Sequence, residues 1–442
     1  DVKFNRPIVV PPNTPVTIRI AALVQDSNQI DVVLRTETTG FGVNHFQATC
    51  RFNTPGEPCR DVPVERLPVE RLEVEIKSSP VLPLQPKRDL YGGILFHQGR
   101  FQRLQTYYKL RAKECCAEIE SDSQENWFSH YLPAQLILGD PGARDAVIHG
   151  IQACIPHRTL LPIGVEKIVI GSASPTDSWF LHATERIQQG DTFIYDVDVT
   201  NKDGKLIEHW QGLQLKAVHP VTPDTWVAPL LSAYIERRLK EQIPNISLDI
   251  AILEDTHLKR QQRSDRAIQT LIQTTPIRRP DGKPEITGNQ QISITHAGNI
   301  TLACTSLNPI GCDIEPVMPR TTAVWQDLLG KERFNLARAI AKATQEPLDI
   351  TATRIWSTSE CLKKVGAMVN SPLVLLETLG DGEVWLESGE SAIASFVLRL
   401  RDIEQPLVFA LLLQPTDHST SPNLEKRDRW INNWQPIPIS TR

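Results

Sequence analysis

The sequence lacks the features that would place it in a membrane or outside the cell. Its longest apolar stretch is Leu407–Leu413, whereas a membrane-spanning helix needs about 20 apolar residues. No basic segment followed by an apolar core opens the chain, so no signal peptide is predicted. The eight cysteines form no C-x-x-C pair, and none stands at zinc-ligand spacing from a histidine. These absences favour a reduced, cytoplasmic setting.

The chain also lacks the composition of a disordered protein and the charge of a polyanion binder. It has 442 residues, of which 40% are hydrophobic and 22% charged, as is ordinary for a folded protein. At about 150 residues per domain, roughly three domains are expected. The net charge is −5 at pH 7, so any anion site must be a local patch. Neither nucleic acid nor a membrane is expected as a partner.

The first half divides into two strand-rich units joined by a proline-rich linker. Residues 1–80 show strand patterns only, and three prolines within residues 80–87 predict a stiff linker. Residues 88–218 predict one strand over 107–120, then a helix, then four strands. If the units are repeats, the first lacks its opening strand and helix. A chain that opens on Asp1 rather than Met agrees with this, so a piece of a longer protein is expected.

The helix of the second unit carries an acid and a histidine on one face. Asp140 is a good N-cap and Pro141 a good first residue, so a helix is predicted from there to about Ile155. Asp145 and His149 are four residues apart and share a face. A buried carboxyl has a raised pKa and can donate a proton to a leaving hydroxyl. A solvated Asp–His pair is the alternative, and the spacing leaves both open.

The rest of the sequence predicts a connecting helix and a mixed domain. Residues 219–245 contain a proline-flanked amphipathic helix. Residues 246–415 predict strands, a basic helix over 258–273 and two later helices, and residues 416–442 predict a polar tail. The fold class expected for the chain is therefore α+β.

Three carboxylates of this mixed domain have spacings that suit a cation site. Asp313 and Glu315 are two residues apart, so both side chains point the same way if the segment is extended. Glu360 and Lys364 lie one helical turn apart, about 45 residues further on. Carboxylates of this kind bind Mg²⁺, which can hold a pyrophosphate. A Glu–Lys helix pair and two solvated acids are the alternative.

A basic patch precedes these acids. Residues 259–283 hold seven lysines and arginines against two acids, a net charge of +5. A solvated helix face is the ordinary explanation of such a run. Nucleic acid is disfavoured because the patch is small and has no aromatic residues among its charges.

The sequence around Asp145 resembles the dehydratase domains of polyketide synthases. The resemblance is carried by YGGILFHQGRFQRL at 91–104, DAVIH at 145–149 and LLPIGV at 160–165. It is strongest to iterative enediyne-type synthases, where LLFH-x-GRF and RDA-x-x-H-x-x-QA segments are typical. It implies a double hotdog, with the remainder of the first hotdog in 1–80 and the second in 88–218. Asp145 and His149 match the catalytic D-x-x-x-(Q/H) motif.

The same resemblance implies a catalytic histidine that the sequence does not contain. In the family it lies in an H-x-x-x-G-x-x-x-x-P motif on the first hotdog's helix, and residues 1–442 hold no such motif. Residues 1–7 resemble the segment that follows it, so this base is expected upstream. His45, His97 and His157 do not stand at the family's position and are not predicted to be catalytic.

Residues 246–415 resemble the Sfp-type phosphopantetheinyl transferases through four ordered motifs. The motifs are GCDIE at 311–315, WSTSECLKK at 356–364, DGKP at 281–284 and SITHAG at 293–298. Two positions depart from the family, because Ser359 and Thr295 stand where lysine and serine are usual. The resemblance implies that Asp313, Glu315 and Glu360 bind Mg²⁺, that Glu360 also deprotonates the acceptor serine, and that Lys364 neutralises phosphate charge. The implied contacts to coenzyme A are Arg263, Arg279, Lys283, Thr295 and His296.

Together the resemblances imply the C-terminal part of an iterative polyketide synthase. Its dehydratase would convert a 3-hydroxyacyl thioester into a trans-2-enoyl thioester. Its transferase would move phosphopantetheine from coenzyme A to a carrier-domain serine. The implied partners are the acyl carrier protein domain and upstream domains of the same synthase, and a second copy in a homodimer. The alternatives are a transferase fused to a noncatalytic hotdog docking scaffold and a hotdog thioesterase.

Overall fold

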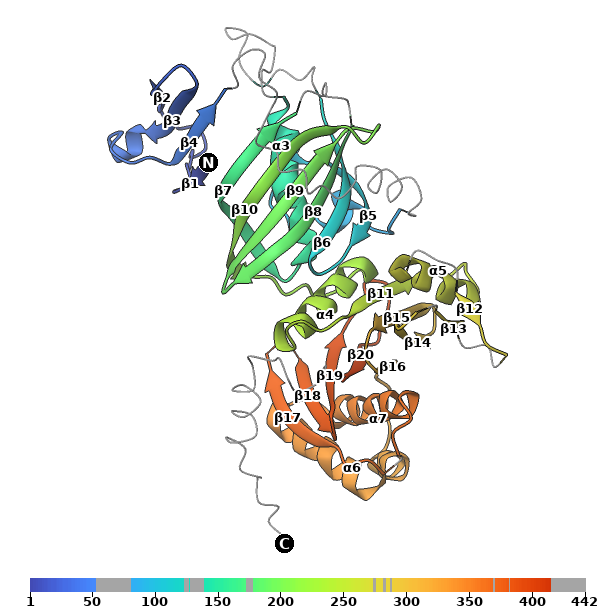
Figure 1. Ribbon diagram of the computed structural model, residues 1–442. Helices are drawn as coiled ribbons and strands as arrows, with labels where there is room; N and C mark the ends of the chain where they lie inside the picture. Colours follow the sequence, from blue (N-terminus) through green and yellow to red (C-terminus); the bar gives the residue numbers. More distant parts are fainter. Residues whose placement is uncertain are drawn as a thin grey trace. The chain divides into compact units, whose positions relative to one another are not determined.

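A computed structural model divides the chain into two compact units, Asp1–Pro223 and Asp224–Arg442 (Figure 1). It describes residues 1–52, 81–122, 127, 139–171, 178–272, 276–280, 284–286, 288–368, 370–380 and 382–414. The predicted tail at 416–442 and Lys283 lie outside this set. Both units combine helices with strands, so the α+β prediction is confirmed. The finer domain boundaries stay predictions.

The first unit is built on a ten-stranded sheet, and every pairing described in it is antiparallel. The strand order is β2-β3-β4-β1-β7-β10-β9-β8-β6-β5. The short β1 joins the two halves of the sheet, because Val2 lies opposite both Ala48 and Val165. The strands are β1 (Val2–Phe4), β2 (Ile18–Val24), β3 (Gln29–Thr36), β4 (Phe46–Arg51), β5 (Leu104–Leu110), β6 (Glu114–Glu120), β7 (Arg158–Ile170), β8 (Ser178–Gln189), β9 (Thr192–Thr200) and β10 (Leu206–Pro220).

The single strand predicted over 107–120 is wrong, because the segment forms a β5–β6 hairpin. Leu110 lies opposite Cys115, and the Arg111 amide donates to the Glu114 carbonyl at 2.8 Å. The turn contains neither glycine nor proline, so the sequence carries no signal that would break the strand. The hairpin predicted at 201–204 is confirmed, with Gly204 at φ 74°.

Helix α3 (Pro141–His149) packs against this sheet and begins as predicted. The Asp140 carboxylate accepts a hydrogen bond from the Gly142 amide at 2.8 Å, which is an N-cap. The α-helix ends at His149 rather than near Ile155, and the chain continues as the 3₁₀ turn η3 (Gly150–Cys154). A Cβ at Gly150 would lie 2.9 Å from Leu181 of β8. The end of α3 therefore approaches the sheet too closely for a side chain.

The second unit contains a three-stranded sheet, a two-stranded pair and a five-stranded sheet. Their orders are β11-β15-β14, β12-β13 and β16-β20-β19-β18-β17 (Figure 1). The strands are β11 (Asp249–Glu254), β12 (Ile277–Arg278), β13 (Pro284–Glu285), β14 (Gln291–Ala297), β15 (Ile300–Ser306), β16 (Ile310–Pro316), β17 (Val374–Leu379), β18 (Glu383–Ser388), β19 (Ser391–Leu398) and β20 (Leu407–Leu413).

Four helices of the second unit are described. They are α4 (Ala228–Gln242), α5 (Arg260–Ile272), α6 (Thr322–Thr344) and α7 (Leu348–Lys364). The helix predicted as a connector is α4, which is largely buried and packs against β11. Among the described residues, no helix is both long and apolar enough to cross a bilayer.

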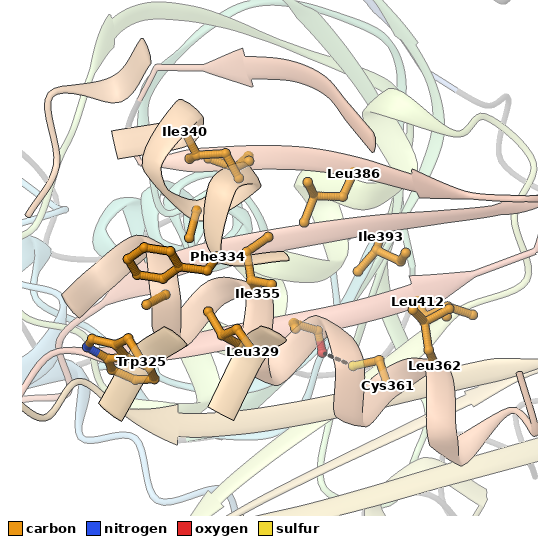
Figure 2. Packing of buried hydrophobic residues seen from close by; sticks show 14 residues of the cluster. Trp325, Leu329, Phe334, Ile340, Ile355, Cys361, Leu362, Leu386, Ile393 and Leu412 are labelled. Atoms are coloured by element: carbon orange, nitrogen blue, oxygen red, sulfur yellow. Dashed lines mark hydrogen bonds between the residues drawn. The ribbon is translucent and has the colours of Figure 1, made fainter. Parts of the chain in front are cut away.

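The main apolar core of the second unit lies between α6, α7 and the five-stranded sheet (Figure 2). Helix α7 packs against α6, β16 and β20. Figure 2 shows Trp325 and Phe334 of α6, Ile355 of α7, and Ile393 and Leu412 of the sheet within this cluster. This packing fixes α7 beside β16, the strand that carries the predicted acids.

We expect Leu412→Ala to lower the free energy of unfolding of the second unit by about 2–5 kcal/mol, because it removes packed methyl groups and leaves a cavity. Leu412 is fully buried in β20. Urea unfolding followed by tryptophan fluorescence measures the change. Leu328→Ala is the control, at a leucine 41% exposed, and should change the value by less than about 0.5 kcal/mol. Equal changes in both variants would contradict the assigned core.

Candidate functional site

Asp145 lies between two histidines in the first unit. Its Oδ2 is 3.1 Å from Nδ1 of His149, one turn along α3, and 3.3 Å from Nε2 of His97. His97 comes from the loop before the 3₁₀ turn η2 (Gly99–Phe101). From the sequence, His97 is not predicted to be catalytic, because it does not stand at the family's histidine position. The signal that could have found it is its place in the LFH-x-GRF segment that carries the dehydratase resemblance.

A buried ion pair anchors the helix that carries Asp145. The Arg144 guanidinium donates from Nε and Nη2 to Glu208 Oε1 of β10, at 2.8 and 2.5 Å. The other Glu208 oxygen accepts from Trp210 Nε1 at 2.8 Å. Glu208 is buried, so loss of the Arg144 contact would leave an unpaired charge in the interior. This anchor holds Asp145, the next residue, at a fixed place beside the sheet.

Tyr91 orients the His149 ring. The Tyr91 oxygen accepts from the Leu104 amide at 3.1 Å and lies 3.0 Å from His149 Nε2. Burial raises the pKa of Tyr91 to about 12, and the charge of Asp145 adds to the rise, so the hydroxyl keeps its proton at neutral pH. A Tyr91 hydroxyl that donates to Nε2 pairs with the His149 tautomer that carries its proton on Nδ1, where the proton can be donated to Asp145. The opposite tautomer donates from Nε2 to the Tyr91 oxygen.

His97 is a neutral, stacked imidazole. Its ring lies 3.9 Å from that of His149 and 4.4 Å from that of Phe96, centroid to centroid. Burial lowers the pKa of His97 to about 4, and His149 lowers it further while Asp145 opposes the change. Its Nδ1 is buried and has no hydrogen-bond partner within the described part of the chain. The side chains of His149, His97 and Asp145 are 5%, 14% and 32% exposed, so Asp145 is the member that a substrate can reach.

We expect the free energy of unfolding of the first unit to rise with pH between about pH 4 and pH 6.5. A histidine whose pKa falls on folding binds its proton more readily in the unfolded chain. Acid therefore favours unfolding from pH 6.5, the ordinary pKa, down to the folded pKa of His97 near 4. Urea unfolding at a series of pH values measures the slope. His97→Gln should flatten it and the exposed-site control His219→Gln should not; an unchanged slope in His97→Gln would contradict this assignment.

In the second unit, the structure brings the predicted strand acids to the predicted helix positions. β16 is extended, and α7 packs against it. Trp356 Nε1 donates to Glu315 Oε1 at 3.2 Å. Lys364 Nζ donates to Asp313 Oδ1 at 3.1 Å and to the Cys312 carbonyl at 2.7 Å. Two segments about 45 residues apart thus form one polar cluster.

Asp313 is the most constrained acid of this cluster. Besides Lys364, it accepts from Thr295 Oγ1 at 3.0 Å and from Ser357 Oγ at 2.9 Å. Glu360 instead pairs with Lys363 at 2.6 Å. The sequence left open an ion pair between Glu360 and Lys364. The structure instead pairs Glu360 with Lys363 and Lys364 with Asp313.

The chemistry of these acids fits a hard cation. Burial raises the pKa of Glu315, and the charges of Asp313 and Glu360 raise it further. Burial would lower the pKa of Lys364, but neighbouring groups, Cys312 and Asp313 foremost, raise it overall. The oxygen donors and excess negative charge suit Mg²⁺. Among the described residues, however, only His97, Asp145 and His149 have ligand atoms all within 4.8 Å of one another, so the three carboxylates are near neighbours that do not converge on one point.

Two of the predicted coenzyme A contacts, Arg263 and His296, lie on α5 and β14. His296 lies among basic side chains, and burial, followed by the charges of Arg260 and Arg263, lowers its pKa to about 4. Its Nε2 lies 3.2 Å from Ser264 Oγ. Arg263 is buried and donates to the backbone carbonyls of Leu258 and Gly298 at 2.7 and 2.8 Å, which ties α5 to the β14–β15 turn. Arg279 is exposed, and its contact with coenzyme A stays a prediction.

Comparison with known families supports the dehydratase part of the prediction. Residues 71–225 match the family model described as "Polyketide synthase dehydratase N-terminal domain". The matched segment contains His97, Asp145 and His149, so these residues lie in a dehydratase-type domain. The match ends at residue 225 and leaves the transferase resemblance as a prediction. No curated protein matches the chain.

Similar solved structures include several polyketide synthase dehydratases. The dehydratase from the CurJ module of curacin polyketide synthase is 13% identical, covers 50% of this chain and 74% of its own, and gives a TM-score of 0.37. For the CurF module the values are 17%, 49%, 75% and 0.36. For RzxB from Pseudomonas fluorescens they are 13%, 49%, 74% and 0.33. At TM-scores this low, none of these likenesses carries an argument.

Proposed function

We propose that the first unit removes water from 3-hydroxyacyl thioesters, with Asp145 as the general acid. The observation that carries the proposal is the partly exposed Asp145 carboxyl held between two imidazoles. In this reaction the C2–H and C3–O bonds break, the C2–C3 double bond forms, and the hydroxyl leaves as water. A carboxyl at the hydroxyl supplies the proton that makes it a leaving group. The proton lost from C2 replaces it, so no net proton is consumed.

The C2 proton also requires a base. The family motif supplies this base from a histidine that has no counterpart in residues 1–442. Two imidazoles face Asp145 in this chain, and His97 is the candidate base, because both nitrogens of His149 are already engaged. Water loss that disappears in His97→Gln would assign the base to His97. Water loss that persists there would make His97 a residue that only positions Asp145.

The test is incubation of the 442-residue protein with a 3-hydroxyacyl thioester of pantetheine or of a carrier domain. Mass spectrometry should show loss of one water, with an α,β-unsaturated thioester as product. A free acid would instead identify the hotdog thioesterase. Unchanged substrate with folded protein would favour the noncatalytic scaffold.

We further propose that the second unit transfers phosphopantetheine from coenzyme A to a carrier-domain serine. The cluster of Asp313, Glu315, Glu360 and Lys364, which lies on the segments that resemble the transferases, supports this. Mg²⁺ would offset the charge of the pyrophosphate once the three carboxylates, which do not converge on one point in the described arrangement, turn toward it. The described partner of Glu360 is the exposed Lys363, so the Glu360 carboxylate lies beside solvent. Glu360 would therefore accept the serine proton. Lys364 would neutralise charge that develops on the phosphate.

Two details of the cluster refine this proposal. Ser359 Oγ donates to the Ile355 carbonyl at 2.7 Å, so it turns back onto its own helix and does not replace the lysine usual at that position. Lys363 provides an ammonium on the same turn of α7. Thr295 hydrogen-bonds Asp313, so it would act on the metal side of the site. The basic side chains around His296 would hold a phosphate of coenzyme A.

Both activities share a carrier domain as partner. We therefore propose that the chain is part of an iterative, enediyne-type polyketide synthase in the cytoplasm. The transferase would activate the carrier, and the dehydratase would act on the acyl chain that the carrier then holds.

A further inference from the structure

The side chains around Asp145 also meet the distance requirements of a transition-metal site. One ligand atom from each of His97, Asp145 and His149 lies within 4.8 Å of the others. Tetrahedral zinc with bonds of about 2.0–2.1 Å separates its ligand atoms by roughly 3.3–3.4 Å. The Oδ2–Nδ1 and Oδ2–Nε2 distances here are 3.1 and 3.3 Å. Two of the three ligand–ligand distances therefore match zinc, and the third lies within 4.8 Å. The rings of His97 and His149, which are stacked at 3.9 Å, must turn apart for both nitrogens to face one ion.

The donor set and its origin in the fold also match zinc. Asp145 and His149 are at i and i+4 of one helix, which presents two ligands on the same face. The third ligand, His97, comes from a separate loop, so folding of the unit brings the three ligands together. Two imidazoles and one carboxylate favour zinc over the hard cations Mg²⁺ and Ca²⁺. Three protein ligands leave a fourth position for water, on the side where Asp145 is 32% exposed.

The surroundings provide His149 with the outer support that a metal-binding histidine needs. A zinc-bound histidine donates its other ring N–H to a nearby acceptor, which fixes the ring. With zinc on Nδ1 of His149, that N–H is Nε2, and the Tyr91 oxygen lies 3.0 Å from it. Phe96 stacks on His97 at 4.4 Å and limits its rotation. His149 is thus held by a hydrogen bond before any ion arrives, whereas, outside the three ligands, the His97 ring is held by stacking alone, because its Nδ1 has no hydrogen-bond partner among the described residues.

We propose that His97, Asp145 and His149 bind one zinc ion. Binding stands independently of the dehydratase proposal. A consequence that does rest on that proposal is inhibition, because an Asp145 carboxylate that ligates zinc cannot deliver a proton to a hydroxyl.

The experiment is a zinc titration of the purified 442-residue protein after metal removal by a chelator. A chromophoric chelator in competition measures affinity, and Co²⁺ in place of zinc reports tetrahedral coordination through its visible absorption. Wild type should bind one equivalent of zinc. His97→Gln should bind zinc more than about 100-fold more weakly, because losing even a residue that hydrogen-bonds a ligand costs 10–100-fold in affinity. Asp145→Asn, which keeps the shape of the side chain, should also weaken binding strongly.

His182→Gln is the matched control. His182 is also a buried histidine beside a carboxylate, with Nε2 2.8 Å from Glu114 Oε1, but it belongs to no three-ligand group among the described residues. It should bind zinc as wild type does. Zinc binding that is absent in wild type, or equal in wild type and His97→Gln with both folded by circular dichroism, would overturn the proposal. Dehydration that continues with zinc bound would overturn only the inhibition and leave the binding site in place.

Discussion

Asp145→Asn should slow water loss from a 3-hydroxyacyl thioester by about 10²–10⁴-fold, the usual contribution of a general acid. Asparagine keeps the size of the side chain and can still hydrogen-bond, but it cannot deliver a proton. The fold should survive, because the contacts that anchor α3 come from Arg144 and from the Asp140 cap rather than from Asp145. Mass spectrometry of the acyl thioester measures the rate.

Asp198→Asn is the matched control for this prediction. Asp198 on β9 accepts from Nδ1 of His209 on β10 at 2.7 Å. Its side chain is 34% exposed, compared with 32% for Asp145. The control thus removes the same chemical group from an Asp–His pair outside the cluster and should leave water loss unchanged. Equal rates in wild type and Asp145→Asn would return Asp145 to a structural helix pair.

Asp313→Asn and Glu360→Gln should each lower phosphopantetheine transfer by at least about 10²-fold, and chelation of Mg²⁺ should abolish it. Several kcal/mol of charge stabilisation is at stake when a metal ion is lost from a phosphate reaction, and each 1.36 kcal/mol is a factor of ten. The two acids come from a strand and a helix, so a shared ligand explains both losses. The mass gain of an apo carrier domain with coenzyme A, with and without EDTA, is the measurement.

Asp349→Asn, on the same helix as Glu360, is the control. It is compared with Glu315→Gln. Asp349 accepts from Trp325 Nε1 at 2.6 Å, as Glu315 accepts from Trp356 Nε1 at 3.2 Å. Both variants weaken a carboxylate–indole hydrogen bond, but only Glu315→Gln touches the acid cluster. Transfer should fall in Glu315→Gln and persist in Asp349→Asn. Full activity in EDTA, or in Asp313→Asn, would leave the second unit as a binding module.

Local chemistry explains what the sequence predicted well. The Asp140 cap and the start of α3 depend on neighbouring residues, and they are where the sequence placed them. The spacing of Glu360 and Lys364 fixes a shared helix face regardless of the rest of the fold. These features need no knowledge of long-range contacts.

Contacts between distant segments explain what it missed. His97 reaches Asp145 only because the loop after Tyr91 folds back over α3, with the Leu95 amide bonded to the Leu90 carbonyl. Lys364 could pair with Glu360 or cross to β16, and its burial against Asp313 decides for the latter. Spacing along one helix contains no information on either choice.

Exchange of the 3-hydroxyl oxygen with heavy-oxygen water tests the central claim most directly, because it reports breaking and re-forming of the C3–O bond at the site of Asp145. The folded wild-type chain should incorporate the label into a 3-hydroxyacyl thioester, and the Asp198→Asn variant should do so at the same rate. Asp145→Asn should be slower by the same 10²–10⁴-fold that general acid catalysis contributes. Label that enters equally in wild type and Asp145→Asn, or in neither, would contradict the assignment of Asp145 as the acid.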